Sequence, residues 1–251
     1  MAAVAIDYER IIPRRIAGMP PSGIRKFFDL LDGMTDVTAL TVGQPDFVTP
    51  WHIREAGIES LEKGKTYYTS NAGTMELRQE ICAYLARRFS LQYDPAHETV
   101  VTVGGSEAID IAMRALLEPG DEVIVPTPSF VCYGPLASMA GGVPIYLELK
   151  EENQFRLTAQ ELRSAITPRT KALVLPFPSN PTGGVLSRAS LEAIAAIARE
   201  HDLLVLTQSM TIKWLEKKVI DLQTRINALE TVGNTDTVTM MQVRQLVGSA
   251  A

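Results

Sequence analysis

The segment Pro178-Ser179-Asn180-Pro181-Thr182-Gly183 holds an amide side chain in a rigid turn directly after the apolar run at 172–175. A short apolar run closed by two prolines and a glycine predicts a buried strand that ends in a turn. Ligands of open α/β sheets bind at the carboxyl ends of the strands. Asn180 is therefore a candidate hydrogen-bond donor to a ligand. The alternative interpretation is that its side chain only caps the turn.

A second candidate ligand-binding segment is the glycine turn Gly104-Gly105-Ser106-Glu107. It lies between a β-branched run at 99–103 and an amphipathic run at 106–117. Glycines let the backbone approach a ligand, and the free N–H groups and dipole of a following helix favour an anion such as phosphate. Ser106 adds a hydroxyl. The spacing matches neither the Walker loop nor the dinucleotide fingerprint, so an ordinary helix cap remains the alternative.

An aromatic residue follows the next predicted strand. Phe130 lies in the proline-rich turn Pro126-Thr-Pro-Ser-Phe, and a flat ring there can stack on a planar heteroaromatic ligand. Because parallel strands end at one edge of their sheet, we expect Phe130, Gly105 and Asn180 to share that edge. The three positions together would offer a phosphate cradle, an aromatic platform and an amide donor.

The elements that must position these residues alternate between strand-like and helix-like runs. Strands are predicted at 99–103, 122–125, 143–147, 172–175 and 203–206, and helices at 24–31, 106–117, 130–140, 157–166 and 188–201, with a further helix ending at Arg88. Thr158 and Ser187 are expected to be the N-caps of two of these helices. Alternating strands and helices predict an α/β fold with a mostly parallel sheet and right-handed crossovers.

Composition narrows the class of protein. The chain has 251 residues and a net charge of −5, which gives no nucleic-acid signature, and no apolar run reaches membrane-spanning length. We expect a cytoplasmic protein without nucleic-acid or membrane partners. The two cysteines and three histidines are scattered without ligand spacing, so no metal site or disulfide is expected.

Five motifs in one order resemble a known family. They are Leu-Thr-Val-Gly-Gln-Pro-Asp-Phe at 40–47, Tyr-Thr-Ser-Asn-Ala-Gly-Thr-Met-Glu-Leu-Arg at 68–78, Thr-Val-Gly-Gly-Ser-Glu-Ala at 102–108, Pro-Gly-Asp-Glu-Val at 119–123 and Pro-Ser-Asn-Pro-Thr-Gly at 178–183. Together they resemble the class I/II aminotransferases related to aspartate aminotransferase, fold-type I enzymes that use pyridoxal 5'-phosphate. The resemblance implies a three-layer large domain, incomplete here, over 46–206, behind an N-terminal arm and substrate loop at 1–45.

The resemblance also implies roles for single residues. Gly43 would contact the substrate carboxylate, Tyr68 would reach the cofactor phosphate of the neighbouring subunit, Gly105, Ser106 and Glu107 would contact the phosphate, Phe130 would stack on the ring, and Asn180 would donate to its phenolic oxygen. From residue type alone, Tyr67 and Tyr68 are more typical of packing. The implied activity is amino-group transfer between an amino acid and a 2-oxo acid by a homodimer, with the cofactor as electron sink.

The pattern of the family breaks after Leu206. Gln208 stands where the family has the aspartate that keeps the ring nitrogen protonated, and an amide cannot replace a carboxylate in this role. The lysines after Asn180 are Lys213, Lys217 and Lys218, and they lack the serine-rich context of the family's cofactor-binding lysine. We therefore expect the chain by itself to be inactive. The family's sheet order also predicts that the other four strands pair with each other, while 99–103 either loses its neighbour or moves to a new edge of the sheet.

Residues 207–251 are of a different sequence type. Apolar residues at spacings of three and four recur over 212–229, which predicts either a short coiled coil or a single amphipathic helix that packs on its own domain. Two other functions therefore remain open: a non-enzymatic oligomerising protein with a passive α/β part, and an intact nucleotide-binding α/β domain. The abrupt join suggests that an aminotransferase sequence, truncated after Leu206, continues into an unrelated tail.

Overall fold

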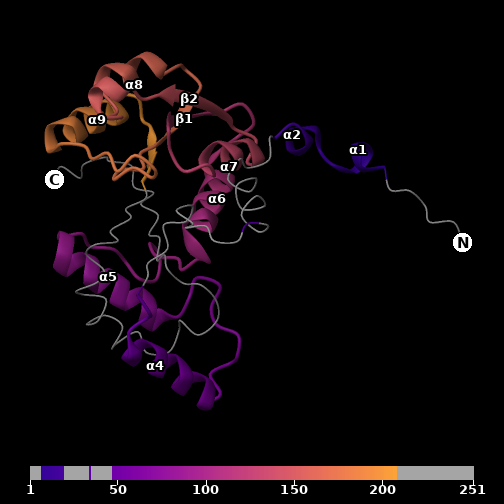
Figure 1. Cartoon of the computed structure of the whole chain (residues 1–251), viewed down its shortest axis with the longest axis vertical. Helices are drawn as coiled ribbons and strands as arrows, with labels where there is room; N and C mark the ends of the chain where they lie inside the picture. The colour runs from indigo at the N-terminus through magenta and orange to yellow at the C-terminus, as the bar shows by residue number, and fades with distance from the viewer. Residues whose placement is uncertain (1–6, 20–33, 35–46, 208–251) are drawn as a thin grey trace, which may run out of the picture. The chain divides into compact units, whose positions relative to one another are not determined.

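The computed structural model describes residues 7–19, 34 and 47–207 (Figure 1). It divides into two units, residues 1–48 and 49–251, which we describe separately. In the first unit, α1 (Tyr8–Ile11) and α2 (Arg14–Ala17) are single helical turns. Gly43, Gln208, the predicted helix at 24–31 and the heptads at 212–229 lie outside the described residues.

The second unit contains a four-stranded parallel sheet, which confirms the predicted α/β class. Its strands are β1 (Glu122–Thr127), β2 (Val143–Glu148), β3 (Thr170–Val174) and β4 (Leu204–Leu206), in the spatial order β2-β1-β3-β4. Ile124 lies opposite Ile145 on β2 and Leu173 on β3, and Leu173 lies opposite Val205 on β4. The carboxyl ends of all four strands therefore point to one edge.

Helices cover both faces of this sheet, so the fold has three layers (Figure 1). On one face Val123 and Val125 pack with α6 (Gly104–Leu116) and α7 (Tyr133–Met139). On the other face Ile124 packs with α8 (Ala159–Ala165) and α9 (Arg188–Glu200). Successive residues of a strand point to opposite faces, and because both faces of the sheet are covered, residues 123–126 of β1 are all apolar.

Two predicted helix starts are confirmed. Thr158 caps α8 by accepting a hydrogen bond from Glu161 N at 3.2 Å, and the Glu161 side chain binds back to Thr158 N at 2.9 Å, which completes a capping box. Ser187 caps α9 by accepting from Ser190 N at 3.1 Å. A short 3₁₀ turn, η1 (Glu151–Asn153), lies between β2 and α8.

The predicted strand at 99–103 is wrong, because this segment has no strand partner in the described part of the chain. It is held instead by α5 (Met75–Phe89) and the turn before that helix. Val101 N donates to Ala72 O at 3.0 Å, and the buried side chains of Cys82 and Thr99 are hydrogen bonded at 3.1 Å. The β-branched composition is typical of a strand, but pairing decides whether one forms. The predicted alternative in which 99–103 loses its sheet neighbour agrees with this structure.

Helix boundaries account for the other differences. The helix predicted at 130–140 begins only at Tyr133, because residues 128–132 form the turn that carries Phe130. An additional helix, α4 (Trp51–Glu62), begins directly after Pro50. Among the described residues, no helix has the length and apolarity needed to cross a membrane.

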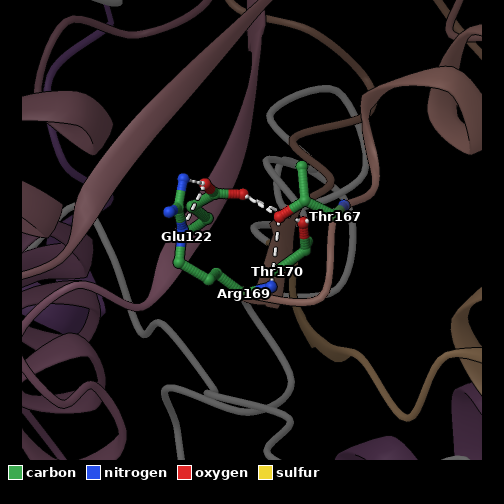
Figure 2. A network of polar contacts seen from close by, with 4 residues as sticks. All are labelled: Glu122, Thr167, Arg169 and Thr170. Atoms are coloured by element: carbon green, nitrogen blue, oxygen red, sulfur yellow. Dashed lines mark hydrogen bonds and ion pairs between the residues drawn. The ribbon is translucent and has the colours of Figure 1, made fainter.

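A network of polar contacts around the buried carboxylate of Glu122 fixes the amino end of the sheet, opposite the edge predicted to bind a ligand (Figure 2). The carboxylate of Glu122, whose side chain is 2% exposed, accepts from Thr167 Oγ1 at 2.5 Å and from Arg169 Nη2 at 2.6 Å. The hydrogen bond from Thr167, and then that from Arg169, lower the pKa of Glu122. Beside it, Lys171 Nζ binds the Asp121 carboxylate at 2.8 Å. These contacts join the start of β1 to the start of β3.

Candidate functional site

The site begins at the first turn of α6. The N–H groups of a helix's first turn have no helical acceptor. Here Gly104 N bonds to Thr102 O at 2.9 Å, and Val103 N bonds to a carboxylate oxygen of Glu107. The N–H groups of Gly105 and Ser106 have no acceptor among the described residues. Together with the positive end of the helix dipole, they form a donor pair suited to an anion.

Gly104 makes this turn possible. Its φ of +81° lies in the left-handed region that favours glycine, and an added Cβ would meet open space. The chain can therefore turn sharply from the 99–103 segment into α6.

The turn before α7 lies against the same helix end. The Ser106 side chain lies close enough to Cys132 to lower the pKa of its thiol, although burial outweighs this effect, and both Cys132 and Phe130 pack against the core formed by α6, α7 and the sheet. Burial raises the pKa of the Cys132 thiol to about 11, so the thiol stays neutral. The Phe130 and Tyr133 rings meet edge to face, with 6.2 Å between their centroids and 79° between their planes. Cys132, two residues after Phe130, therefore lies close to Ser106 at the start of α6.

Asn180 lies on a closed loop beyond the carboxyl end of β3. Ser179 N donates to Gly184 O at 2.9 Å, and Gly183 N donates to Ser179 O at 2.8 Å. Ser179 is buried, whereas Asn180 is exposed. Because β1 and β3 are parallel, this loop follows the same sheet edge as the Phe130 turn. The exposed amide is available to a ligand.

The environments of Tyr68 and Glu107 differ from those predicted. Tyr68 is fully exposed and Tyr67 is mostly exposed, so the packing interpretation of these tyrosines is wrong for the described part of the chain. The carboxylate of Glu107 is bound to Val103 N, so only the backbone of Glu107 could serve a phosphate. Cys132 was missed, because nothing in the sequence indicated that it contacts Ser106.

Comparison with known proteins gives the family. Residues 35–210 match the family described as aminotransferase class I and II. The chain is 52% identical over 190 residues to the putative aminotransferase YugH of Bacillus subtilis, and 45% identical over 190 residues to an aspartate aminotransferase of Pyrococcus abyssi. The chain belongs to the class I and II aminotransferases.

Solved structures agree with this membership in the class I and II aminotransferases. The aspartate aminotransferase of Thermus thermophilus with maleate superposes with a TM-score of 0.73 at 42% identity, over 78% of this chain and 52% of that chain. The chain also spans about half the length of the curated relatives it matches, since YugH is covered over 49% of its length and 76% of this chain is aligned. Members of the family depend on pyridoxal phosphate.

The donor set at α6 fits the phosphate of that cofactor. Two free N–H groups, the Ser106 hydroxyl and a helix N-terminus are the groups that bind phosphate in many folds. Phe130 offers a ring for the planar heterocycle, and Asn180 offers an amide. Across the described residues, no group of three or more His, Cys, Asp or Glu side chains could hold a metal ion.

Proposed function

We propose that this chain carries a pyridoxal-phosphate binding region of an aminotransferase that transfers an amino group between an amino acid and a 2-oxo acid. The observation that supports the proposal is that Cys132, two residues after Phe130 in the turn before α7, lies close to Ser106 at the free end of α6. In this proposal the donors at the start of α6 bind the phosphate and the ring of Phe130 stacks on the heterocycle. When bound, the cofactor supplies an electron sink for the bonds at the amino acid Cα.

The proposed roles divide among three groups of residues. Gly105 and Ser106 bind the phosphate through N–H groups and the Ser106 hydroxyl, with the backbone of Glu107 beside them. Phe130 stacks on the ring, and Asn180 donates to its phenolic oxygen. Tyr68 is fully exposed, which is consistent with a role in the site of a neighbouring subunit. Gly43 would bind the substrate carboxylate, as in the family.

We further propose that the 251-residue chain does not catalyse transamination by itself. Gln208 is an amide where the family has a ring-nitrogen carboxylate, and an amide does not stabilise a proton there. Lys213, Lys217 and Lys218 lack the sequence context of the family's nucleophile. We therefore expect this chain to bind pyridoxal phosphate without catalysing transamination.

Equilibrium dialysis with pyridoxal phosphate and with pyridoxal, which lacks the phosphate, tests binding. We expect Ser106→Ala to weaken binding of pyridoxal phosphate only, and Phe130→Ala to weaken binding of both compounds. Equal affinities of the wild-type chain for the two compounds would exclude the proposed phosphate site. Borohydride reduction followed by mass spectrometry tests inactivity, and a single stoichiometric cofactor adduct on one lysine would contradict it.

For residues 207–251 we propose a coiled-coil segment that joins copies of the chain, on the strength of the heptad spacing at 212–229. Leu222→Asp would place a charge on the predicted apolar seam, whereas Asp221→Ala alters the adjacent position outside it. Light scattering of the full-length variants should show a smaller assembly for Leu222→Asp alone. An unchanged mass for that variant would rule out assembly through the heptads.

A further inference from the structure

Glu107 places a fixed negative charge at the start of α6. Its Oε2 atom accepts the hydrogen bond of Val103 N, the residue immediately before the helix. Glu107 is exposed, and within the described part of the chain no cation forms an ion pair with it. A carboxylate in the first turn is stabilised by the helix dipole, so this contact helps to cap the helix.

The same turn holds the donors proposed for the phosphate. Gly105 and Ser106 lie between Val103 and Glu107 in the sequence, so the carboxylate is bound two residues before the free N–H groups begin. A phosphate bound to those groups would lie within the same helical turn as the carboxylate. Two like charges at this range repel each other, and the repulsion grows as water is excluded.

A second acidic residue on α6 provides a contrast. The carboxylate of Asp110, one turn further along, accepts two hydrogen bonds from Arg114 Nε, each at 2.9 Å. Its charge is therefore largely balanced, and it lies outside the first turn. The charge of Glu107 is bound by a neutral N–H group and remains unbalanced.

We infer that Glu107 is a specificity-determining residue of the phosphate site, which limits how tightly the helix end holds a dianionic phosphate. The inference rests on the proposed function. The carboxylate caps α6 and at the same time reduces the preference of the site for pyridoxal phosphate over pyridoxal. The affinity for the phosphate group is thereby kept below what the free N–H groups and the helix dipole would otherwise give.

Glu107→Gln tests this role, because glutamine keeps a carbonyl oxygen for Val103 N and removes the charge. In equilibrium dialysis at low salt, we expect Glu107→Gln to bind pyridoxal phosphate about five- to tenfold more tightly, with pyridoxal binding unchanged. Asp110→Asn is the matched control and should change the ratio of the two affinities less than about twofold. At about 0.5 M KCl the difference between Glu107→Gln and wild type should shrink, because salt screens exposed charges.

Within each variant, the affinity for pyridoxal phosphate is divided by the affinity for pyridoxal. This ratio does not depend on the fraction of the protein that is folded. An unchanged or lower ratio in Glu107→Gln would overturn the inference, because capping would then be the only role of this side chain. A wild-type chain without preference for the phosphate would count against the proposed function. In that case a preference gained by Glu107→Gln still supports the inference, and no gain overturns it.

Discussion

Arg169 donates two hydrogen bonds to a single carboxylate oxygen of Glu122, from Nε at 2.9 Å and from Nη2 at 2.6 Å (Figure 2). The guanidinium is largely exposed, whereas the carboxylate that it binds is buried. The other oxygen of Glu122 accepts from Thr167. Hydrogen-bond donors to both oxygens stabilise the ionised form of this buried carboxylate. The amino end of the sheet should therefore lose stability when acid protonates Glu122.

Acid should therefore weaken the fold through Glu122. The hydrogen bond from Thr167 and then that from Arg169 lower its pKa from the ordinary 4.5, so its contribution to stability is complete above pH 4.5. That contribution is lost as the pH falls through the lower, folded-state pKa. Urea unfolding between pH 7 and pH 3 should show a steeper loss of stability for wild type than for Glu122→Gln. Glu192→Gln, which alters an exposed pair with Arg188, should follow wild type. Parallel curves for wild type and Glu122→Gln would contradict this assignment.

The packing of α6 on the sheet predicts a large difference between two positions of that helix. Met113 is 1% exposed within the core, whereas Ile111 on the same helix is 44% exposed. Met113→Ala should lower the free energy of unfolding by about 2–5 kcal/mol, because it removes buried apolar atoms and leaves a cavity. Ile111→Ala should change it by less than about 0.5 kcal/mol. Similar losses for both variants in chemical denaturation would show that α6 does not pack as described.

Gly73 should tolerate no side chain, for two separate reasons. Its φ is +87°, and an added Cβ would lie 2.7 Å from both Cβ and Cγ2 of Val101. Gly64 has a similar φ of +65° but open space around the added atom, so Gly64→Ala measures the backbone strain alone, about 1 kcal/mol. Gly73→Ala should cost more in unfolding free energy and should reduce hydrogen-exchange protection of the Val101 amide. Unchanged protection would mean that the turn and the 99–101 segment are not packed together.

Cys132 should react slowly with alkylating reagents. Burial raises its pKa from 9.0 to about 11, which lowers the thiolate fraction near pH 8 about a hundredfold. Iodoacetamide labelling resolved by mass spectrometry should show slow modification of Cys132 relative to free glutathione. Labelling at the rate of glutathione would indicate that the turn before α7 is open to solvent.

Sequence patterns predicted the parallel sheet because its strands carry their own signals. The apolar runs near 122–125, 144–147, 172–175 and 203–206 all form strands, and Thr158 and Ser187 cap helices as expected. The 99–103 run has the same β-branched character but no strand partner among the described residues. Strand formation depends on a neighbour that local composition does not encode.

The candidate site was predictable to a similar extent. The turns that carry Phe130 and Asn180 lie at one edge because the parallel strands β1 and β3 both end there, and this part could be predicted from the order of the motifs. The partners of Glu107 and Cys132 could not be predicted, because both contacts depend on the angle at which the chain enters α6 and α7. Side-chain contacts of this kind are set by packing rather than by spacing.

The spatial order β2-β1-β3-β4 has a consequence for synthesis on the ribosome. Successive strands begin at residues 122, 143, 170 and 204, and β1 pairs with β3 as well as with β2, so every strand pairing joins residues that are distant in sequence. Contacts that are local in sequence form early, and domains fold as units while the chain is still emerging. The helices can therefore form before the sheet, and the last strand pairing, between β3 and β4, must wait until Leu206 has left the exit tunnel.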